Sequence, residues 1–366
     1  MIYPFKLDPH YITMMQAATR LRPISRALST TASTPVPPAH PTFAPSESQE
    51  FTLPDGRILG FAEYGHPNGF PLFAFHGFPS SRIECYPLDR LAHNLRIKVY
   101  ALERPGFGIS TFQKDRKITD YPSDVLAFAK GKGINRFSIV GASGGGPYAL
   151  ACARYLPKEL MAGVCVFAGG PPWQAGRGYM QWWARWSEWL VRVSPTTFTV
   201  LANGLAGIVR WVIGTQWATK KMDQFLESEE KKKKERETPL PEDELGYLRE
   251  GELTTEQRRE RVLGLVWNEP FRQGTQAFVH EIRLLSAQSW GFEFGDVEYP
   301  VKIYHGKRDI NAPIEMIRWM AERLPNATLT EFDDTHFTMG GRFRQAIEEA
   351  VPEDEKNEFL EKQSRI

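Results

Sequence analysis

The chain has 366 residues, 42% hydrophobic and 24% charged, so it can bury a large core and fits neither a disordered nor a fibrous protein. At about 150 residues per domain, this length indicates two to three units, or one large α/β domain with an insertion. Lys and Arg number 45 against 44 Asp and Glu, and the net charge of +1 gives no field that favours a nucleic acid partner.

Residues 1–49 have the composition of a leader rather than of a folded domain. Residues 15–46 contain no Asp or Glu, while Arg20, Arg22 and Arg26 alternate with apolar residues and precede Ser and Thr. This composition is typical of a mitochondrial presequence, although Pro23 interrupts the basic helix; an untargeted tail on a cytoplasmic protein is the alternative. A proline-rich linker follows, and we expect the folded part to begin near Glu50.

Short apolar runs alternate with helical patterns along most of the remaining chain. A Pro-Asp-Gly turn at residues 54–56 joins the strand patterns 50–52 and 58–62 into a hairpin. Buried strands are expected at residues 71–75, 97–102, 137–140, 164–167, 301–304 and 328–332. Helices are expected around residues 87–95, 121–131, 147–155 and 314–324. The alternation predicts an α/β fold with a mostly parallel sheet covered on both faces.

Residues 172–294 interrupt this alternation and contain nine of the ten tryptophans. Apolar residues recur there at helical spacing in two series, Trp182, Trp186, Trp189 and Val193, and Leu201, Leu205, Ile208 and Val212. We expect a helical cap inserted into one core made of residues 50–171 and 295–366. The tryptophan series predicts packing of the cap on the core, with the lining of an apolar substrate pocket as the alternative.

No transmembrane segment is expected, because Asn203 and Arg210 interrupt the best apolar run. Peripheral membrane contact through residues 198–212 remains an alternative, which Arg210 and the lack of an obvious basic face disfavour. The three cysteines are isolated and in apolar surroundings, so a reducing interior is expected, with no disulfide framework, metal or cofactor.

The decisive motif is Gly-Ala-Ser-Gly-Gly at residues 141–145, between a predicted strand and a predicted helix. This is the G-x-S-x-G nucleophile elbow in its required context, with Ser143 as the nucleophile. A phosphate-binding loop does not fit, because Pro147 and Tyr148 stand where that loop needs Lys and Ser or Thr. Here the chain resembles the α/β-hydrolase superfamily of the serine-nucleophile type with a helical cap, which implies an eight-stranded sheet.

A serine nucleophile needs a histidine base, and that base needs an acid. In the family the order is Ser, acid, His, and the chain offers Asp309 and then His336, each just after a predicted strand. Asp333 and Asp334 are alternative acids. His280 lies in the predicted cap, where a packing or surface role is expected.

The predicted strand 71–75 runs into His76-Gly77-Phe78-Pro79, which resembles the oxyanion turn of the family. The resemblance implies that the backbone N–H groups of Phe78 and Gly144 are the oxyanion donors. We expect His76 to brace this loop. Glu103 begins another loop that resembles the family, at a position where the family usually has Asp, and a structural ion pair is expected there.

Together these features predict a serine hydrolase that cleaves a carboxylic ester of a small apolar substrate through an acyl-enzyme. An Asp at position 143 would instead have implied epoxide hydrolase or haloalkane dehalogenase chemistry. Amide, peptide or thioester cleavage on the same fold is the first alternative. A non-enzymatic binding protein that keeps the fold is an alternative of another class.

Overall fold

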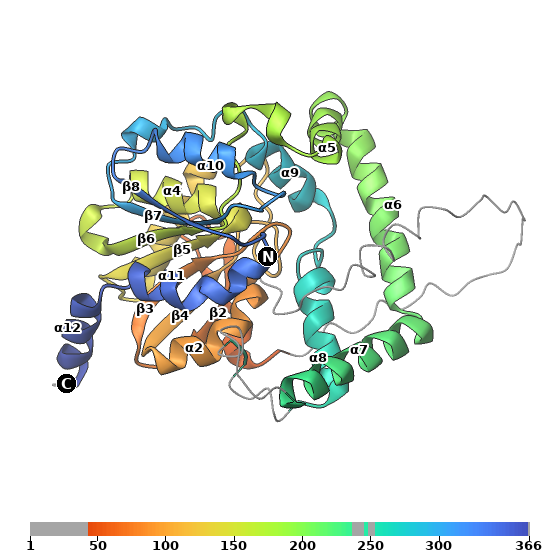
Figure 1. Ribbon diagram of the computed structural model, residues 1–366, viewed down its shortest axis with the longest axis horizontal. Helices are drawn as coiled ribbons and strands as arrows, with labels where there is room; N and C mark the ends of the chain where they lie inside the picture. The colour runs from red at the N-terminus through yellow and green to blue at the C-terminus, as the bar shows by residue number, and fades with distance from the viewer. Residues whose placement is uncertain (1–42, 236–244, 248–252, 365–366) are drawn as a thin grey trace, which may run out of the picture.

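The computed structural model describes residues 43–235, 245–247 and 253–364, which form an eight-stranded sheet with helices on both faces and a helical cap (Figure 1). The strands are β1 (Gln49–Thr52), β2 (Ile58–Gly65), β3 (Phe70–Phe75), β4 (Ile97–Leu102), β5 (Phe137–Ala142), β6 (Met161–Phe167), β7 (Val301–Gly306) and β8 (Ala327–Phe332). The helices of the core are α2 (Asp89–Asn94), α3 (Tyr121–Gly131), α4 (Gly146–Tyr155), α10 (Ile314–Ala321), α11 (Phe343–Ala350) and α12 (Glu353–Ser364).

The strands lie in the order β1-β2-β4-β3-β5-β6-β7-β8. The pairs β1–β2 and β2–β4 are antiparallel, and every pair from β4 to β8 is parallel. The predicted mostly parallel sheet is therefore confirmed. Parallel strands place their carboxyl ends at one edge of the sheet, where the loops that carry the predicted site residues begin.

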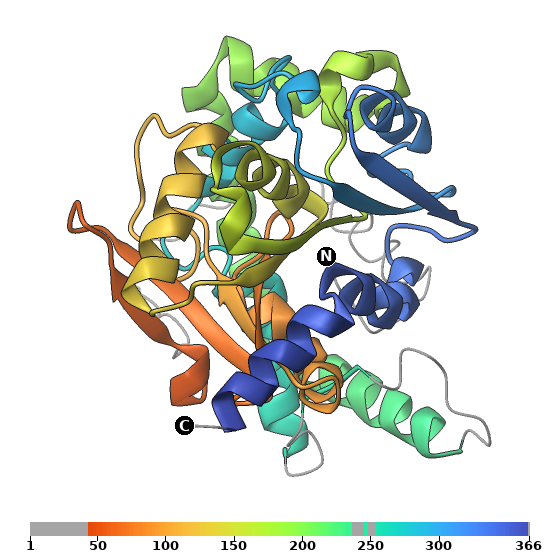
Figure 2. The ribbon, with the colours of Figure 1, turned by 90° about the vertical axis from the view of Figure 1, so that its left-hand side faces the viewer.

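Both faces of the sheet are apolar, because successive residues of a strand point to opposite sides. Phe73 and Phe75 of β3 belong to the apolar cluster that includes α3, α4 and α10. Leu72 and Ala74 belong to the cluster that includes α2 and α11. Figure 2 shows α3 in yellow and α11 and α12 in dark blue on opposite sides of the sheet.

The described chain begins before the boundary near Glu50 that composition predicts. Phe43 and Glu47 are buried, and the Glu47 carboxylate accepts hydrogen bonds of 2.7 and 2.8 Å from the Arg261 guanidinium. Composition does not reveal this ion pair, because its partners are 214 positions apart. The predicted leader, residues 1–49, lies outside the described residues except for residues 43–49, which are ordered against the core through Phe43 and Glu47.

The cap lies between β6 and β7, to the right of the sheet in Figure 1. Its helices are α5 (Trp182–Val193), α6 (Pro195–Ile213), α7 (Gln216–Glu235), α8 (Thr255–Leu263) and α9 (Gln276–Leu285), with a π-helical turn at Gly264–Asn268. Helices α5 and α6 pack on each other and on α9, and α7 packs on α8. The helical cap inserted into the core is the arrangement that the sequence predicts.

The prediction that the tryptophan series packs the cap on the core is wrong for α5. Trp182, Trp186 and Trp189 are 72%, 50% and 51% exposed, so they neither pack on the core nor line a closed pocket. The buried face of α5 instead carries Ala184, which packs with Trp173, Met180 and Met316, and Val191, which packs with Val279 of α9. Spacing of apolar residues shows that they share a helix face, but not whether that face points inward.

Helix α6 is long and apolar enough to cross a membrane by length and composition, which differs from the prediction of no such segment. An 18-residue window of this helix has a mean hydropathy of 1.3, and only 6% of the window is buried in the protein. The two criteria disagree because an average over the window tolerates Asn203 and Arg210, whereas an uninterrupted apolar run does not.

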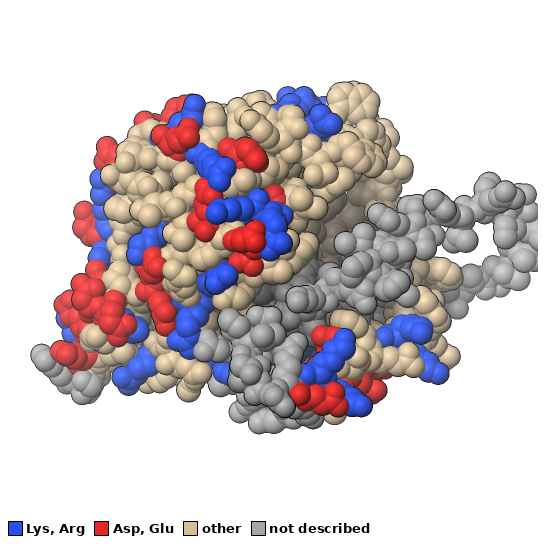
Figure 3. Space-filling view, in the orientation of Figure 1, with Lys and Arg blue, Asp and Glu red and all other residues tan. Residues whose placement is uncertain are grey.

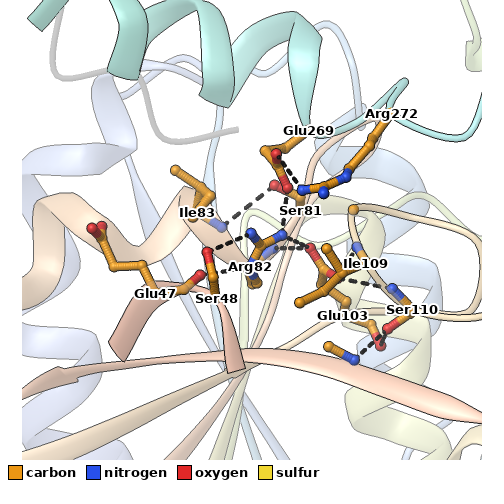
Figure 4. Close-up of polar contacts among 12 residues, drawn as sticks. Glu47, Ser48, Ser81, Arg82, Ile83, Glu103, Ile109, Ser110, Glu269 and Arg272 are labelled. Atoms are coloured by element: carbon orange, nitrogen blue, oxygen red, sulfur yellow. Dashed lines mark hydrogen bonds and ion pairs between the residues drawn. The ribbon is translucent and has the colours of Figure 1, made fainter. Parts of the chain in front are cut away.

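A buried cluster of charges joins the cap to the core (Figure 4). The fully buried Arg82 guanidinium contacts Glu103 at 2.7 Å and Glu269 of the cap at 2.5 Å. The second carboxylate oxygen of Glu103 accepts the N–H groups of Ile109 and Ser110 at 2.8 and 3.2 Å. Glu103 thus forms the structural ion pair that the sequence predicts.

Two glycines explain how a glutamate fits at position 103. A Cβ at Gly108 would lie 1.7 Å from one carboxylate oxygen of Glu103, and a Cβ at Gly60 would lie 2.3 Å from the other. The absence of these side chains leaves the space that the longer carboxylate occupies. Burial raises the pKa of Glu103, and the adjacent Arg82 opposes that shift.

Replacement of Arg82 by Met should destabilise the protein by about 3–5 kcal/mol, because it leaves two buried glutamates without their shared partner. Urea unfolding at neutral pH measures the effect. Lys158→Met is the control, since the pair Lys158–Glu298 is exposed and its loss should cause no measurable change. Equal stabilities of the two variants would contradict this role of Arg82.

Candidate active site

Ser143 lies in a tight turn between β5 and α4, with a backbone φ of +48°. This left-handed conformation is uncommon for a residue other than glycine and indicates a turn held by its surroundings. The flanking glycines are required by close contacts. A Cβ at Gly141 would lie 2.5 Å from the carbonyl oxygen of Gly145, and a Cβ at Gly145 would lie 2.2 Å from that of Phe75.

The structure brings the three predicted residues Ser143, His336 and Asp309 into one hydrogen-bonded line. The Nε2 atom of His336 is 3.2 Å from the Ser143 hydroxyl oxygen, and its Nδ1 atom is 2.6 Å from Oδ2 of Asp309. Because a carboxylate only accepts, Nδ1 carries the proton and Nε2 is free to accept the serine proton. His336 and Asp309 are buried, whereas Ser143 is partly exposed.

The surroundings of Asp309 favour its ionised form. Its Oδ1 atom accepts the backbone N–H groups of Asn311 and Ala312 at 2.8 and 2.9 Å. Burial alone would raise the pKa of Asp309, but the interactions with His336, together with those of His305 and the Ala312 N–H, outweigh burial and hold the pKa below its ordinary value. The nearby His305 donates to the carbonyl of Ala312 at 2.7 Å, and burial lowers its pKa.

The alternative candidates have other partners. Asp333 pairs with Arg308 at 3.0 Å, and Asp334 accepts hydrogen bonds from Thr338 and Arg342. His280 contacts the carbonyl oxygen of Arg116 at 3.0 Å in the half-buried packing role that the sequence predicts.

The predicted oxyanion donors Phe78 and Gly144 border the same space. A Cβ at Gly144 would lie 3.2 Å from the Phe78 nitrogen and 2.6 Å from its Cβ, so only glycine lets the two backbones approach. Leu285 of α9 lies 3.3 Å from the same point. The Phe78 ring stacks on Phe278 of α9 at 5.2 Å. The surroundings of these N–H groups are therefore largely apolar.

Buried polar contacts fix the turn that carries Phe78. His76 donates from Nδ1 to the carbonyl of Gly77 at 2.9 Å and accepts the Arg104 N–H at Nε2. Burial lowers the pKa of His76 well below its ordinary value, which favours this neutral form. The Arg104 guanidinium donates to the carbonyls of His76 and Gly77, and Glu84 accepts the Gly77 N–H at 2.5 Å. His76 thus braces the turn, as the sequence predicts.

Sequence reasoning missed Glu281, a buried carboxylate of α9 behind this turn. Glu281 pairs with Arg104 at 2.8 Å and with Arg116, and it accepts the Tyr148 hydroxyl at 3.0 Å. Helical spacing could have indicated its burial, because Glu281 lies four residues after the buried Ala277 and therefore on the same face of α9. A charge on an apolar face requires a buried partner.

The described residues hold no group of three or more His, Cys, Asp or Glu side chains placed to bind a metal ion. Cys85, Cys152 and Cys165 are free and buried, and burial raises the pKa of each thiol.

Comparisons with known proteins agree with this architecture. The family model described as "alpha/beta hydrolase fold" matches residues 71–340, which include every predicted site residue. A segment of 53 residues is 40% identical to a pimeloyl-[acyl-carrier protein] methyl ester esterase of Aromatoleum aromaticum. That match covers 14% of this chain and 21% of the relative's length.

Solved structures resemble the chain over most of its length. An esterase from Exiguobacterium antarcticum matches with a TM-score of 0.54 and 15% identity, over 83% of this chain and 99% of its own. An enol-lactonase from Burkholderia xenovorans matches with a TM-score of 0.53 and 14% identity, over 83% and 99% of the two chains. At such low identity these likenesses show the fold alone.

Replacement of Asp309 by Asn should lower kcat about 10⁴-fold in an ester hydrolysis assay, because the amide favours the wrong tautomer of His336. Asp334→Asn is the matched control and should keep nearly the activity of the wild type. If the control lost activity while Asp309→Asn kept it, Asp334 would be the acid.

Replacement of Gly144 by Ala should lower kcat by about 10²-fold or more, because the new Cβ displaces Phe78 and one N–H donor. Gly295→Ala is the control, since a Cβ there meets nothing within 4 Å. Steady-state kinetics and thermal unfolding are measured together. Unchanged kcat in folded Gly144→Ala would contradict the assignment of the donors.

Proposed function

The chain belongs to the alpha/beta hydrolase fold family, and from this premise we propose that it is a serine hydrolase acting on carboxylic esters of small apolar substrates. The observation that carries the proposal is the hydrogen-bonded line from Ser143 through His336 to Asp309. Ser143 is activated by a base, the base is oriented by a buried acid, and N–H groups lie beside the hydroxyl.

In the acylation half-reaction, the Ser143 hydroxyl oxygen attacks the carbonyl carbon of the ester while its proton passes to Nε2 of His336. Negative charge develops on the carbonyl oxygen, where the N–H groups of Phe78 and Gly144 stabilise it. Asp309 stabilises the imidazolium that forms. The C–O bond to the alcohol then breaks, and His336 returns the proton to the leaving oxygen.

In the deacylation half-reaction, a water molecule attacks the acyl-enzyme. Its proton passes to His336, and its oxygen forms the new bond to the acyl carbon. The bond to Ser143 breaks, and His336 returns the proton to the serine oxygen, which releases a carboxylic acid. The sum is one ester and one water converted to one alcohol and one acid.

Three observations favour an apolar ester over other acyl substrates. The space beside Gly144, the residue after Ser143, is bordered by Phe78 and by Leu285, which favour apolar groups. The segment of 53 residues resembles a methyl ester esterase, which favours ester cleavage. The oxyanion turn reads His-Gly-Phe-Pro and lacks the His-Gly-Gly-Pro-Gly of proline iminopeptidase-like members, which disfavours a peptidase.

The test measures kcat/KM for ester, thioester and amide derivatives of matched acyl groups, beside labelling by a fluorophosphonate. The wild type should be labelled and should prefer short apolar esters, whereas Ser143→Ala should lose both activity and label. Ser289→Ala, at an exposed serine, is the control. A preference for amides would assign a peptidase or amidase, and absence of both label and turnover in folded protein would favour a binding protein.

A further inference from the structure

The cap presents an outward apolar surface that the proposed reaction does not use. We call it the docking face, and it consists of Trp182, Trp186 and Trp189 on α5 and Leu201, Leu205 and Ile208 on α6. Each of these side chains is at least half exposed. Several large apolar side chains exposed on two helices that contact each other mark an interaction site.

Both helices of the docking face are also packed through other residues. On α5 the buried Ala184 and Val191 lie opposite the three tryptophans. On α6 the N-terminal Phe198 packs with Phe278 of α9, and Leu201 and Leu205 continue its stripe but are exposed. The Asn203 amide oxygen accepts the Thr275 hydroxyl at 2.6 Å and adds a polar contact to the packing of α6. The six residues thus stay exposed although both helices are already packed on α9.

The charge around the docking face is positive. Residues 171–222 contain six basic residues and a single acidic one, Glu188. Glu188 is 2% exposed and pairs with Arg177 and Arg192, so these three residues together carry a net charge of +1. The other basic residues of the stretch are Arg185, Arg210, Lys220 and Lys221, so the expectation of no basic face is wrong for this part of the cap. Figure 3 shows the region over α5 and the upper part of α6, at the upper right, in tan and blue without red.

The positive charge favours some binding partners of the docking face over others. The stretch 15–46 contains no acidic residue and several arginines, so charge does not favour it as the cover. A second copy of the same basic face is repelled for the same reason. Tryptophan beside cations is instead the composition that binds the interface of a membrane with anionic lipids.

We propose that the docking face binds the surface of an anionic phospholipid bilayer, with α5 and α6 lying in its interface. The indole rings of Trp182, Trp186 and Trp189 enter the headgroup region, and the side chains of Leu201, Leu205 and Ile208 reach the acyl boundary. Arg185 and Arg210, both exposed on these helices, remain at the level of the lipid phosphates.

Helix α6 binds along the membrane and does not cross it. Both of its neighbours return to the same folded unit, since α5 packs on α9 and α7 packs on α8. A crossing would place α5 and α7 on opposite sides of the bilayer and break these contacts.

The docking face is close to the candidate active site. The rings of Phe198, Phe278 and Phe78 form a column from α6 to the oxyanion turn, with centroid separations of 6.4 and 5.2 Å. Lipid binding would thus hold this turn near the interface, where apolar esters concentrate. The binding itself does not depend on the proposed reaction.

The test is flotation of the full-length protein with vesicles of phosphatidylcholine alone or of phosphatidylcholine mixed with phosphatidylglycerol. The wild type should float with the anionic vesicles, and its tryptophan emission should shift to the blue. Combined replacement of Leu201, Leu205 and Ile208 by Ser should lower the partition coefficient at least about tenfold, because apolar burial is lost. Tyr155→Ser is the apolar control, at an exposed residue of the core.

A second vesicle experiment tests the role of charge. The double variant Arg185→Gln with Arg210→Gln should have a partition coefficient on anionic vesicles about tenfold lower or more. Lys114→Gln with Lys130→Gln, both exposed on the core, should leave it unchanged. Ser143→Ala should bind vesicles as the wild type does, which separates this proposal from the proposed reaction.

Absence of flotation, or flotation unaffected by the replacement of Leu201, Leu205 and Ile208 by Ser, would overturn the proposal. A lipid-free homodimer that this variant dissociates would assign the face to a second copy.

Discussion

Two buried arginines of the core each hold a buried glutamate of the cap, and the geometry of the candidate site depends on these pairs. Arg82 contacts Glu269, and Arg104 contacts Glu281. A charge buried without its partner costs several kcal/mol, so the cap cannot leave the core without breaking both pairs. Arg104 also donates to the carbonyls of the turn that carries Phe78. The position of the cap and the position of the predicted oxyanion donor are therefore fixed by the same guanidinium.

Much of the core could be predicted from the sequence, because the relevant signals are local. The β5 strand, the turn at Ser143 and helix α4 follow one another within a few residues, and the small residues of the turn are set by contacts with its own neighbours. The loops after β7 and β8 carry Asp309 and His336 to the same sheet edge, because their strands are parallel. Chain order in the resembled family and the direction of the strands were together enough to predict that the three side chains lie close to one another.

The remaining features depend on contacts between residues far apart in the chain. The pairing of Glu47 with Arg261 spans 214 positions, and that of Arg82 with Glu269 spans 187. The orientation of α5 is of the same kind, since helical spacing groups Trp182, Trp186 and Trp189 without showing that they face outward. What places them outward is the packing of the opposite side of α5, where Ala184 contacts the cluster of Met316 and Val191 contacts that of Val279. The tryptophan series therefore has the spacing of a buried helix face but belongs to the exposed docking face.

The most direct measurement of the central claim is a crystal structure of the protein after reaction with an apolar phosphonate. We expect a covalent bond from the Ser143 oxygen to phosphorus. We also expect a phosphoryl oxygen about 3 Å from the backbone nitrogens of Phe78 and Gly144. His336 should remain hydrogen-bonded to Asp309. An adduct on another residue would contradict the role of Ser143 as the nucleophile, and a phosphoryl oxygen directed away from both nitrogens would contradict the role of Phe78 and Gly144 as donors.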